Sequence, residues 1–290
     1  MRLHIRHETR YHLDHPARRS VQYLRLTPRL DRCQQVLRWT ITGPETVAPW
    51  TDGFGNRVHV ASEGEAHSEL VFTVDGEIET MDTCGVLPLD DGLPPMMFLR
   101  DTPRTHADAA ILALAAEAAG VEAAAGIEAT AEATAQPPLA PVGDEVPTLH
   151  RLMGLVADRV AYRAGHTDVG STAAEVLKHG YGVCQDHAHL FIACSRAMGI
   201  PARYVSGYLW SEHTEMASHA WAESWVKGLG WVSFDPANRQ SATDAYVRLA
   251  VGFDYADACP VTGIRAGGGG ESMDVSVTIA PLPGWQSGQQ

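Results

Sequence analysis

The sequence predicts an α+β protein, in which a helix that begins with a cysteine packs on an antiparallel sheet, preceded by a small all-β domain. Short alternating apolar runs separated by turn residues occupy roughly the first 85 residues. An apolar helical pattern then runs from Cys184 to Met198 and stops at Gly199. Strand patterns follow at 202–209, 218–226 and 230–235, and strands grouped after helices are typical of an α+β fold.

The length of 290 residues allows about two domains of ~150 residues each. We expect a β domain over 1–100, a connecting segment with a helix and an Ala/Pro-rich run over 101–146, and a core over 147–290. The strict alternation of apolar and polar residues over 273–279 predicts that the core ends in a strand there. The run from 121 to 142 has little large apolar material, so we expect it to be exposed, mobile or loosely helical.

Charge and cysteine usage exclude several classes of protein. The chain has 22 Lys and Arg against 35 Asp and Glu, a net charge of -13, which argues against nucleic-acid and anionic-membrane partners. No apolar run approaches the ~20 residues of a membrane span, and charges stand where a signal peptide would be apolar. Five cysteines without a C-x-x-C pair suggest reduced thiols. We therefore expect a cytoplasmic protein.

Cys184 is the candidate nucleophile. It follows a glycine-containing interruption of the helical pattern at 180–183 (GYGV). It occupies the first turn of the apolar helix. The free amides at a helix N-terminus favour negative charge, which lowers the pKa of a thiol there. The other four cysteines are interpreted as small apolar residues.

A thiolate needs a base, and the base needs an orienting group. His219 begins one strand and Asp235 ends the next, and the connection at 227–230 (KGLG) predicts a hairpin. An odd number of loop residues would place His219 and Asp235 on the same side of the sheet, whereas an even number would separate them.

A metal site is the rival interpretation, because Cys184, His187 and His189 are all possible zinc ligands. On a helix, however, His189 lies about 140° around the axis from Cys184, so the three cannot meet one ion. Phosphate-binding and dinucleotide-binding glycine motifs are absent from the sequence. We therefore expect neither a metal nor a cofactor.

Four segments together resemble the bacterial transglutaminase-like superfamily: 182–189 (GVCQDHAH), 199–208 (GIPARYVSGY), 219–223 (HAWAE) and 231–236 (WVSFDP). The opening region, with 52–56 (DGFGN), is similar to the N-terminal region of one bacterial branch. The resemblance covers 145–240 well and implies a papain-like transglutaminase core with a Cys184-His219-Asp235 triad. His187 stands where an aromatic residue is expected, and Phe253 where an arginine is expected.

The resemblance implies a thiol-dependent enzyme that cleaves or exchanges amide bonds of a peptide or protein substrate. We favour a cysteine protease or amidase, since no feature marks a site for an acceptor amine. A protein-glutamine transamidase and a non-catalytic interaction module on the same fold are the alternatives. The Cys184 amide is expected to stabilise the oxyanion, with Gln185, Tyr162 or Trp221 as the second donor.

Overall fold

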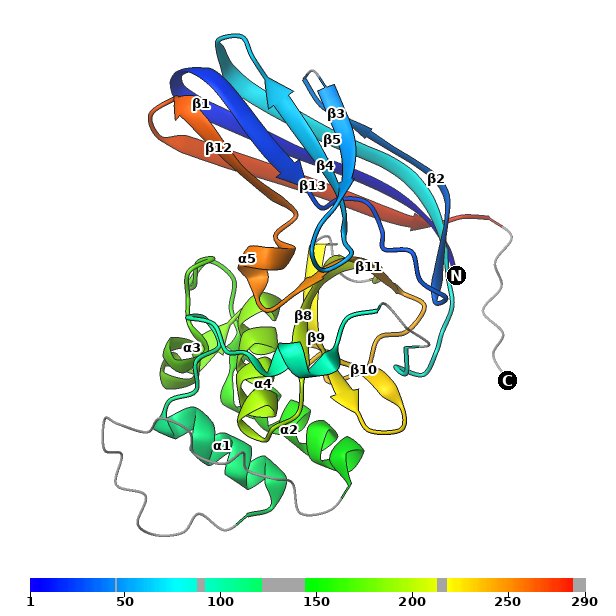
Figure 1. The fold of residues 1–290 in the computed structure, drawn as a ribbon, viewed down its shortest axis with the longest axis vertical. Helices are drawn as coiled ribbons and strands as arrows, with labels where there is room; N and C mark the ends of the chain where they lie inside the picture. The colour runs from blue at the N-terminus through cyan, green and yellow to red at the C-terminus, as the bar shows by residue number, and fades with distance from the viewer. Residues whose placement is uncertain (45, 88–91, 122–143, 213–217, 284–290) are drawn as a thin grey trace.

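The structure is a computed structural model that describes residues 1–44, 46–87, 92–121, 144–212 and 218–283. It has two parts, a strand-rich β domain and a mixed core of helices and strands, stacked along the long axis (Figure 1). In the described residues, no helix is both long enough and apolar enough to cross a membrane. The five cysteines, all of which are described, are free thiols.

The β domain is one sheet made of strands from both ends of the chain. Its members are β1 (Arg2–Leu24), β2 (Gln34–Thr42), β3 (Thr46–Thr51), β4 (Arg57–Glu63), β5 (His67–Thr80), β12 (Val261–Gly267) and β13 (Glu271–Pro281). The first half of β1 pairs with β5 and β13, and its second half pairs with β4 and β12. The register shifts between His12 and Ala17, so the long strand changes partners where it is irregular.

The C-terminal strands differ from the sequence prediction. The pattern at 273–279 does form a strand, β13, but it pairs with β1 rather than with the core at 147–290. Each half of β1 has two edges whose backbone groups need partners, and β5 and β4 each fill only one edge of the half that they pair with. The tail therefore completes the β domain, and the core lies in the sequence between β5 and β12.

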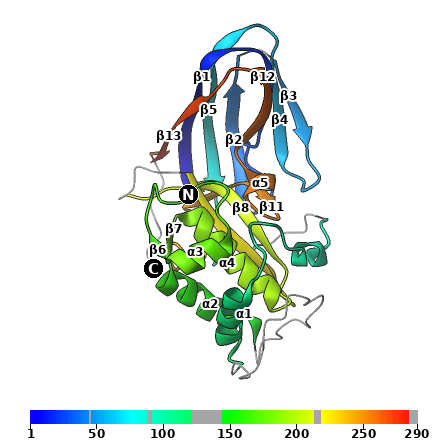
Figure 2. The same cartoon turned by 90° about the vertical axis from the view of Figure 1, so that its left-hand side faces the viewer.

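The core is a four-stranded antiparallel sheet with helices on one face (Figure 2). The strand order is β10-β9-β8-β11, with β8 (Ala202–Leu209), β9 (Ser218–Val226), β10 (Gly230–Phe234) and β11 (Tyr246–Gly252). The helices are α1 (Ala109–Ala119), α2 (Glu145–Arg159), α3 (Ala173–His179) and α4 (Cys184–Ala197), with α5 (Tyr255–Ala258) after β11. A short parallel pair joins β6 (Ala161–Tyr162) to β7 (Tyr181–Gly182). Helix α4 is buried along most of its length, so it forms the centre of the core.

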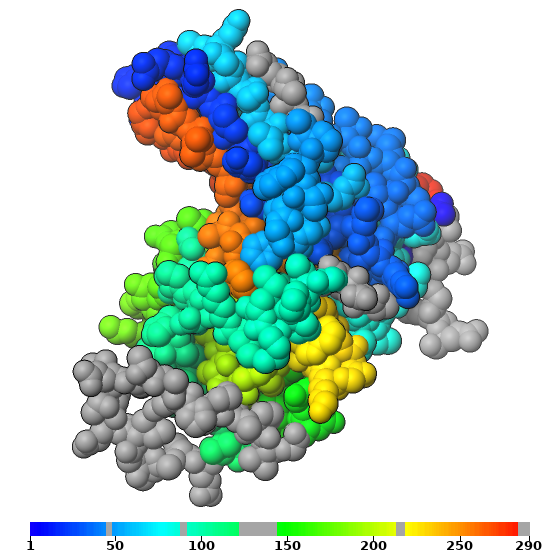
Figure 3. Space-filling model, in the orientation of Figure 1, coloured from blue at the N-terminus to red at the C-terminus, as the bar shows by residue number. Residues whose placement is uncertain are grey.

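The segment between the two parts crosses the face of the core (Figure 3). It contains a 3-10 helix, η1 (Pro95–Leu99), whose Phe98 packs edge-on against Trp231 at 5.2 Å between ring centroids. Helix α1 begins after Asp108, which caps it by accepting a hydrogen bond from the Ile111 amide. The expected stretch at 121–142 lies outside the described residues, apart from Val121.

The turn at 52–56 (DGFGN) joins the β domain to the core. The buried Asn56 side chain bonds both backbone groups of Val251 in β11, donating to its carbonyl and accepting from its amide at 2.8 Å each. Gly55 has a φ of 72°, which glycine adopts without strain. Phe54 packs beside Phe253, with 5.1 Å between ring centroids. The motif thus contributes one of the contacts between the two parts.

Replacing Asn56 by Ala should lower the free energy of unfolding by about 2–4 kcal/mol, because two buried backbone groups lose their partners. Gln35→Ala is the control, since Gln35 is exposed on β2 and should change stability by less than about 0.5 kcal/mol. Urea denaturation of the three proteins measures the difference. Equal stability of the two variants would show that the Asn56 contacts are not needed.

Candidate active site

The N-terminus of α4 places Cys184 at the end of a constrained loop. Asp186 in the first turn accepts hydrogen bonds from the Val183 amide at 2.8 Å and from the Thr167 hydroxyl at 2.7 Å. A Cβ at Gly182 would lie 2.6 Å from the Cβ of Asp186, so only glycine leaves room for this arrangement. The loop before Cys184 is therefore held by the helix that follows it.

The β9–β10 hairpin brings His219 and Asp235 to one face of the core sheet. Gly230 pairs with Val226 and Phe234 pairs with Ala222, which leaves a three-residue loop. Of the two loop parities that the sequence left open, the structure has the odd one, which places both residues on a shared face. Side chains alternate along a strand, so Asp235, one residue beyond Phe234, lies on the same face as His219.

His219 lies between a carboxylate and a thiol. Its Nε2 is 2.6 Å from Oδ2 of Asp235, and the side chains are 9% and 1% exposed. The Cys184 thiol is also close enough to interact with the imidazole. Burial disfavours the imidazolium, but the hydrogen bond to Asp235 and the neighbouring Cys184 outweigh it and raise the pKa of His219 to about 10. The structure thus brings together Cys184, His219 and Asp235.

Asp235 has further partners that the sequence analysis missed. Its Oδ2 also accepts from Asn238 Nδ2 at 2.7 Å and from the Tyr246 hydroxyl at 2.7 Å. Tyr246 in turn accepts from Gln240 Nε2 at 2.8 Å. Burial opposes the charge of Asp235, but His219 and these donors lower its pKa below the usual value. Asn238 lies three residues beyond Asp235 and could have been noticed, whereas Tyr246 comes from β11 and carries no local signal.

The Trp221 indole stacks against the imidazole of His219. Its fully buried ring lies 6.2 Å from that of His219 at 22°, and edge-on to Tyr246 at 5.2 Å. A Cβ at Gly207 would lie 2.7 Å from the Trp221 ring, so the glycine in β8 makes room for the indole. The indole N–H has no partner among the described residues. A fully buried ring is poorly placed to meet a substrate, so this position favours a packing role.

Tyr162 and Gln185 are the other two residues expected near Cys184. Tyr162 ends β6 and is 50% exposed, with its ring 6.2 Å from that of His187. Burial, with the negative charges of Cys184 and Asp235 near it, raises the pKa of Tyr162 to about 12. Its hydroxyl is therefore a neutral donor at neutral pH. Gln185 follows Cys184 in the first turn of α4 and is half-buried.

The histidines of α4 point to separate partners rather than to one ion. His187 has its ring nitrogens 2.8 Å and 2.9 Å from the carbonyls of Val183 and Val160. Nε2 of the fully buried His189 accepts a hydrogen bond from the Tyr255 amide. Across the part of the chain that the structure describes, no group of three or more potential ligand side chains could hold a metal. A hydrogen-bonding role explains how a histidine serves at 187 in place of an aromatic residue.

Comparisons with known proteins agree with this architecture. Residues 131–236 match the transglutaminase-like superfamily, and residues 3–79 match the bacterial transglutaminase-like N-terminal region. An uncharacterised protein of Mycobacterium leprae is 31% identical over 297 residues, covering 97% of this chain and 99% of that protein. Another, from Mycobacterium tuberculosis, is 29% identical over 310 residues, covering 98% and 94%.

The fold also matches a solved structure. A crystal structure of a candidate cysteine protease from Cytophaga hutchinsonii superposes with a TM-score of 0.74 at 21% identity, covering 99% of this chain and 92% of that one. The chain belongs to the transglutaminase-like superfamily. It has a papain-like α+β core and the N-terminal β region of the bacterial branch.

The raised pKa of His219 predicts a specific dependence of stability on pH. The imidazole has a pKa of about 10 in the folded protein and about 6.5 in the unfolded chain, so its protonation stabilises the fold. This contribution is complete below about pH 6.5 and is lost as the pH rises towards about 10. The difference in unfolding free energy between wild type and His219→Gln should be largest near pH 6 and shrink towards pH 10. A difference that stays constant over this range would contradict the raised pKa.

Proposed function

We propose that this protein is a cysteine protease or amidase that hydrolyses peptide or isopeptide bonds through Cys184, His219 and Asp235. The observation that carries the proposal is the position of the His219 imidazole, which bonds the Asp235 carboxylate and lies beside the Cys184 thiol. A nucleophile, a base and an orienting group in contact are the minimum that thiol catalysis requires.

The chemistry follows from this arrangement. His219 holds the proton given up by the Cys184 thiol, as its raised pKa favours, and the thiolate attacks the carbonyl carbon of an amide. The resulting tetrahedral intermediate expels the amine, which receives the proton from His219. Water, activated by the same imidazole, then attacks the thioester and releases the carboxylic acid, which returns the thiol to its starting state.

Asp235 is the orienting group in this proposal. Its Oδ2 faces Nε2 of His219, which assigns the N–H to that nitrogen and leaves Nδ1 for the thiol. The bonds from Asn238 and Tyr246 keep the carboxylate ionised and in place. Both effects stabilise the imidazolium that forms when the thiol is deprotonated.

We assign oxyanion stabilisation to the Cys184 backbone amide and the Tyr162 hydroxyl. The first amides of a helix have no acceptor within the helix, so they are free to donate to a developing negative charge. Of the three side chains considered, Tyr162 combines exposure with a position close to Cys184. Gln185 is the alternative donor.

Transamidation uses the same acyl-enzyme and remains the second candidate, with an amine in place of water. A non-catalytic module would have no need of an imidazole held between a thiol and a carboxylate. A peptide or protein substrate, the absence of nucleic-acid and membrane partners, and a cytoplasmic location remain predictions from the sequence.

Turnover should depend on Cys184 and not on Cys194, which lies on the same helix with its side chain fully buried. Cys184→Ala should abolish hydrolysis of a peptide library and change stability little, because the half-buried thiol at the start of α4 contributes little packing. Cys194→Ala should keep the rate and lose about 1–2 kcal/mol of stability from the core. Adding an amine to the assay separates hydrolysis from transamidation by the mass of the product.

Iodoacetamide gives a second measurement on the same two residues. Burial raises the pKa of the Cys194 thiol, so it should stay unmodified while Cys184 reacts rapidly near neutral pH. Equal activity of Cys184→Ala and wild type, or alkylation of both cysteines at one rate, would favour the non-catalytic module.

Replacing Tyr162 by Phe should lower kcat about 10²-fold and leave KM nearly unchanged, because the lost hydroxyl would act only on the oxyanion. Tyr181→Phe is the control, since Tyr181 is another partly buried tyrosine, in the neighbouring strand β7. Steady-state kinetics on one peptide compare the two variants. If Tyr162→Phe keeps the kcat of the wild type, Gln185 would be the oxyanion donor instead.

A further inference from the structure

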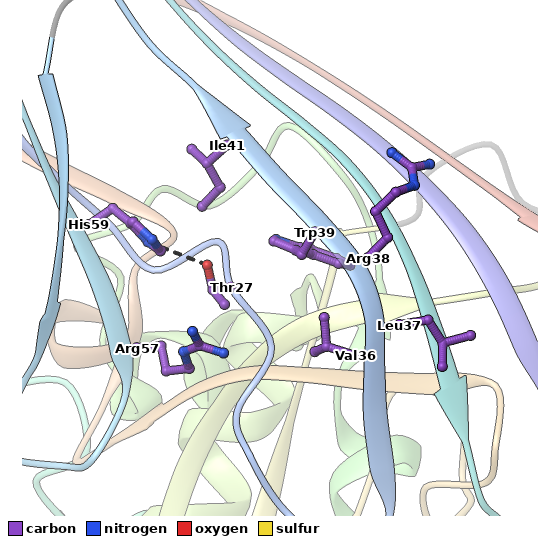
Figure 4. Close-up of a pocket in the computed structure, with 8 residues that line it drawn as sticks. All are labelled: Thr27, Val36, Leu37, Arg38, Trp39, Ile41, Arg57 and His59. Carbon is purple, nitrogen blue, oxygen red and sulfur yellow. Dashed lines mark hydrogen bonds between the residues drawn. The ribbon is translucent and has the colours of Figure 1, made fainter.

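The β domain contains a hollow that the proposed reaction does not use. It lies between β2 and β4 and has a volume of about 210 Å³. The side chains of Val36, Trp39 and Ile41 line it from β2, and those of Arg57 and His59 line it from β4, with Thr27 between them (Figure 4). One wall is therefore apolar and the opposite wall is polar.

The apolar wall is held in place before any ligand arrives. A Cβ at Gly76 would lie 2.1 Å from the Trp39 ring, so the glycine in β5 allows the indole to lie flat on the sheet. The indole N–H donates to the Leu26 carbonyl at 3.0 Å. A register shift between Val36 and Arg38 keeps Val36 on the same side as Trp39, three residues away. A rigid wall lowers the entropic cost of binding.

The polar wall carries one positive charge without a partner. No described residue accepts a hydrogen bond from the guanidinium of Arg57 or forms an ion pair with it. Arg38, which also borders the hollow, turns away from it and is bonded to Asp75 at 2.6 Å and Glu77 at 3.1 Å. Burial, and then the charge of Arg57, lower the pKa of His59, so His59 is neutral at neutral pH. A partly buried arginine without a partner, in a chain of net charge -13, favours an anionic ligand.

The size of the hollow limits the ligand. A volume of 210 Å³ corresponds to about seven water molecules at ~30 Å³ each, below the ~300 Å³ of an ordinary cofactor pocket. A ligand that fills it must therefore present a carboxylate and an apolar group on a single residue. The C-terminal residue of a peptide does so, whereas an internal glutamate carries its charge without the apolar group.

We propose that this hollow binds the C-terminal residue of a peptide, with its apolar side chain on Trp39 and Ile41 and its carboxylate on Arg57. Strand β2 pairs only with β5 among the described strands, so its other edge can donate and accept backbone hydrogen bonds from the extended peptide. The site is separate from the triad and does not depend on its activity.

Calorimetric titration of the full-length Cys184→Ala protein tests the proposal, because this variant cannot consume the peptide. The probe is N-acetyl-alanyl-alanyl-leucine with a free carboxylate. Its C-terminal amide, and an amidated peptide with an internal glutamate, should each bind at least about 10-fold more weakly, since a charge-assisted bond is lost or misplaced. Arg57→Gln in the same background should weaken binding of the free acid by a similar factor.

Arg38→Gln is the matched control, since Arg38 borders the same hollow but is already paired. The affinity of this variant for the free acid should stay within about 2-fold of that of the Cys184→Ala protein. Thermal melting of both variants verifies that they fold. The proposal fails if the free acid does not bind at millimolar concentration, if both arginine variants lose affinity equally, or if the internal glutamate peptide binds as well as the free acid.

Discussion

The register of the β9–β10 hairpin is the constraint on which the site depends. A slip of one residue would turn His219 and Asp235 to opposite faces of the sheet. Glu223, on the same face of β9 as His219, accepts hydrogen bonds from Arg203 and Arg248 at 2.7 Å each. These three side chains are at most 4% exposed, and separating a buried ion pair costs about 3–5 kcal/mol. The ion cluster therefore fixes the face of β9 on which His219 lies, and the three-residue loop sets the register of β10 against it.

Strand β11 connects this site to the β domain. Its Tyr246 bonds the triad carboxylate, and its Arg248 pairs with Asp31 at 2.5 Å. Further along, Val251 receives the Asn56 side chain of the β domain. One strand thus touches the candidate active site at one end and the β domain along the rest. Through β11, the β domain therefore helps to hold the core strands in place.

The candidate active site and the hollow of the β domain differ in how their charges are paired. Around His219, the imidazole and the Asp235 carboxylate are paired and buried, so the site holds a proton in place. In the hollow of the β domain, Arg57 has no side-chain partner among the described residues and is partly open, so its charge is available to a ligand. The first arrangement suits chemistry on a bound carbonyl, and the second suits recognition.

The sequence by itself determined the features that depend on neighbouring residues. The helix start at Cys184 and the hairpin after Val226 are as expected, because turn chemistry and periodicity act over a few positions. Only the tertiary structure decided that β13 joins β1, that Tyr246 bonds Asp235, and that the indole of Trp221 is buried. Those outcomes depend on which sheet edges and which spaces between side chains are left to fill after distant segments meet. No local pattern encodes that information.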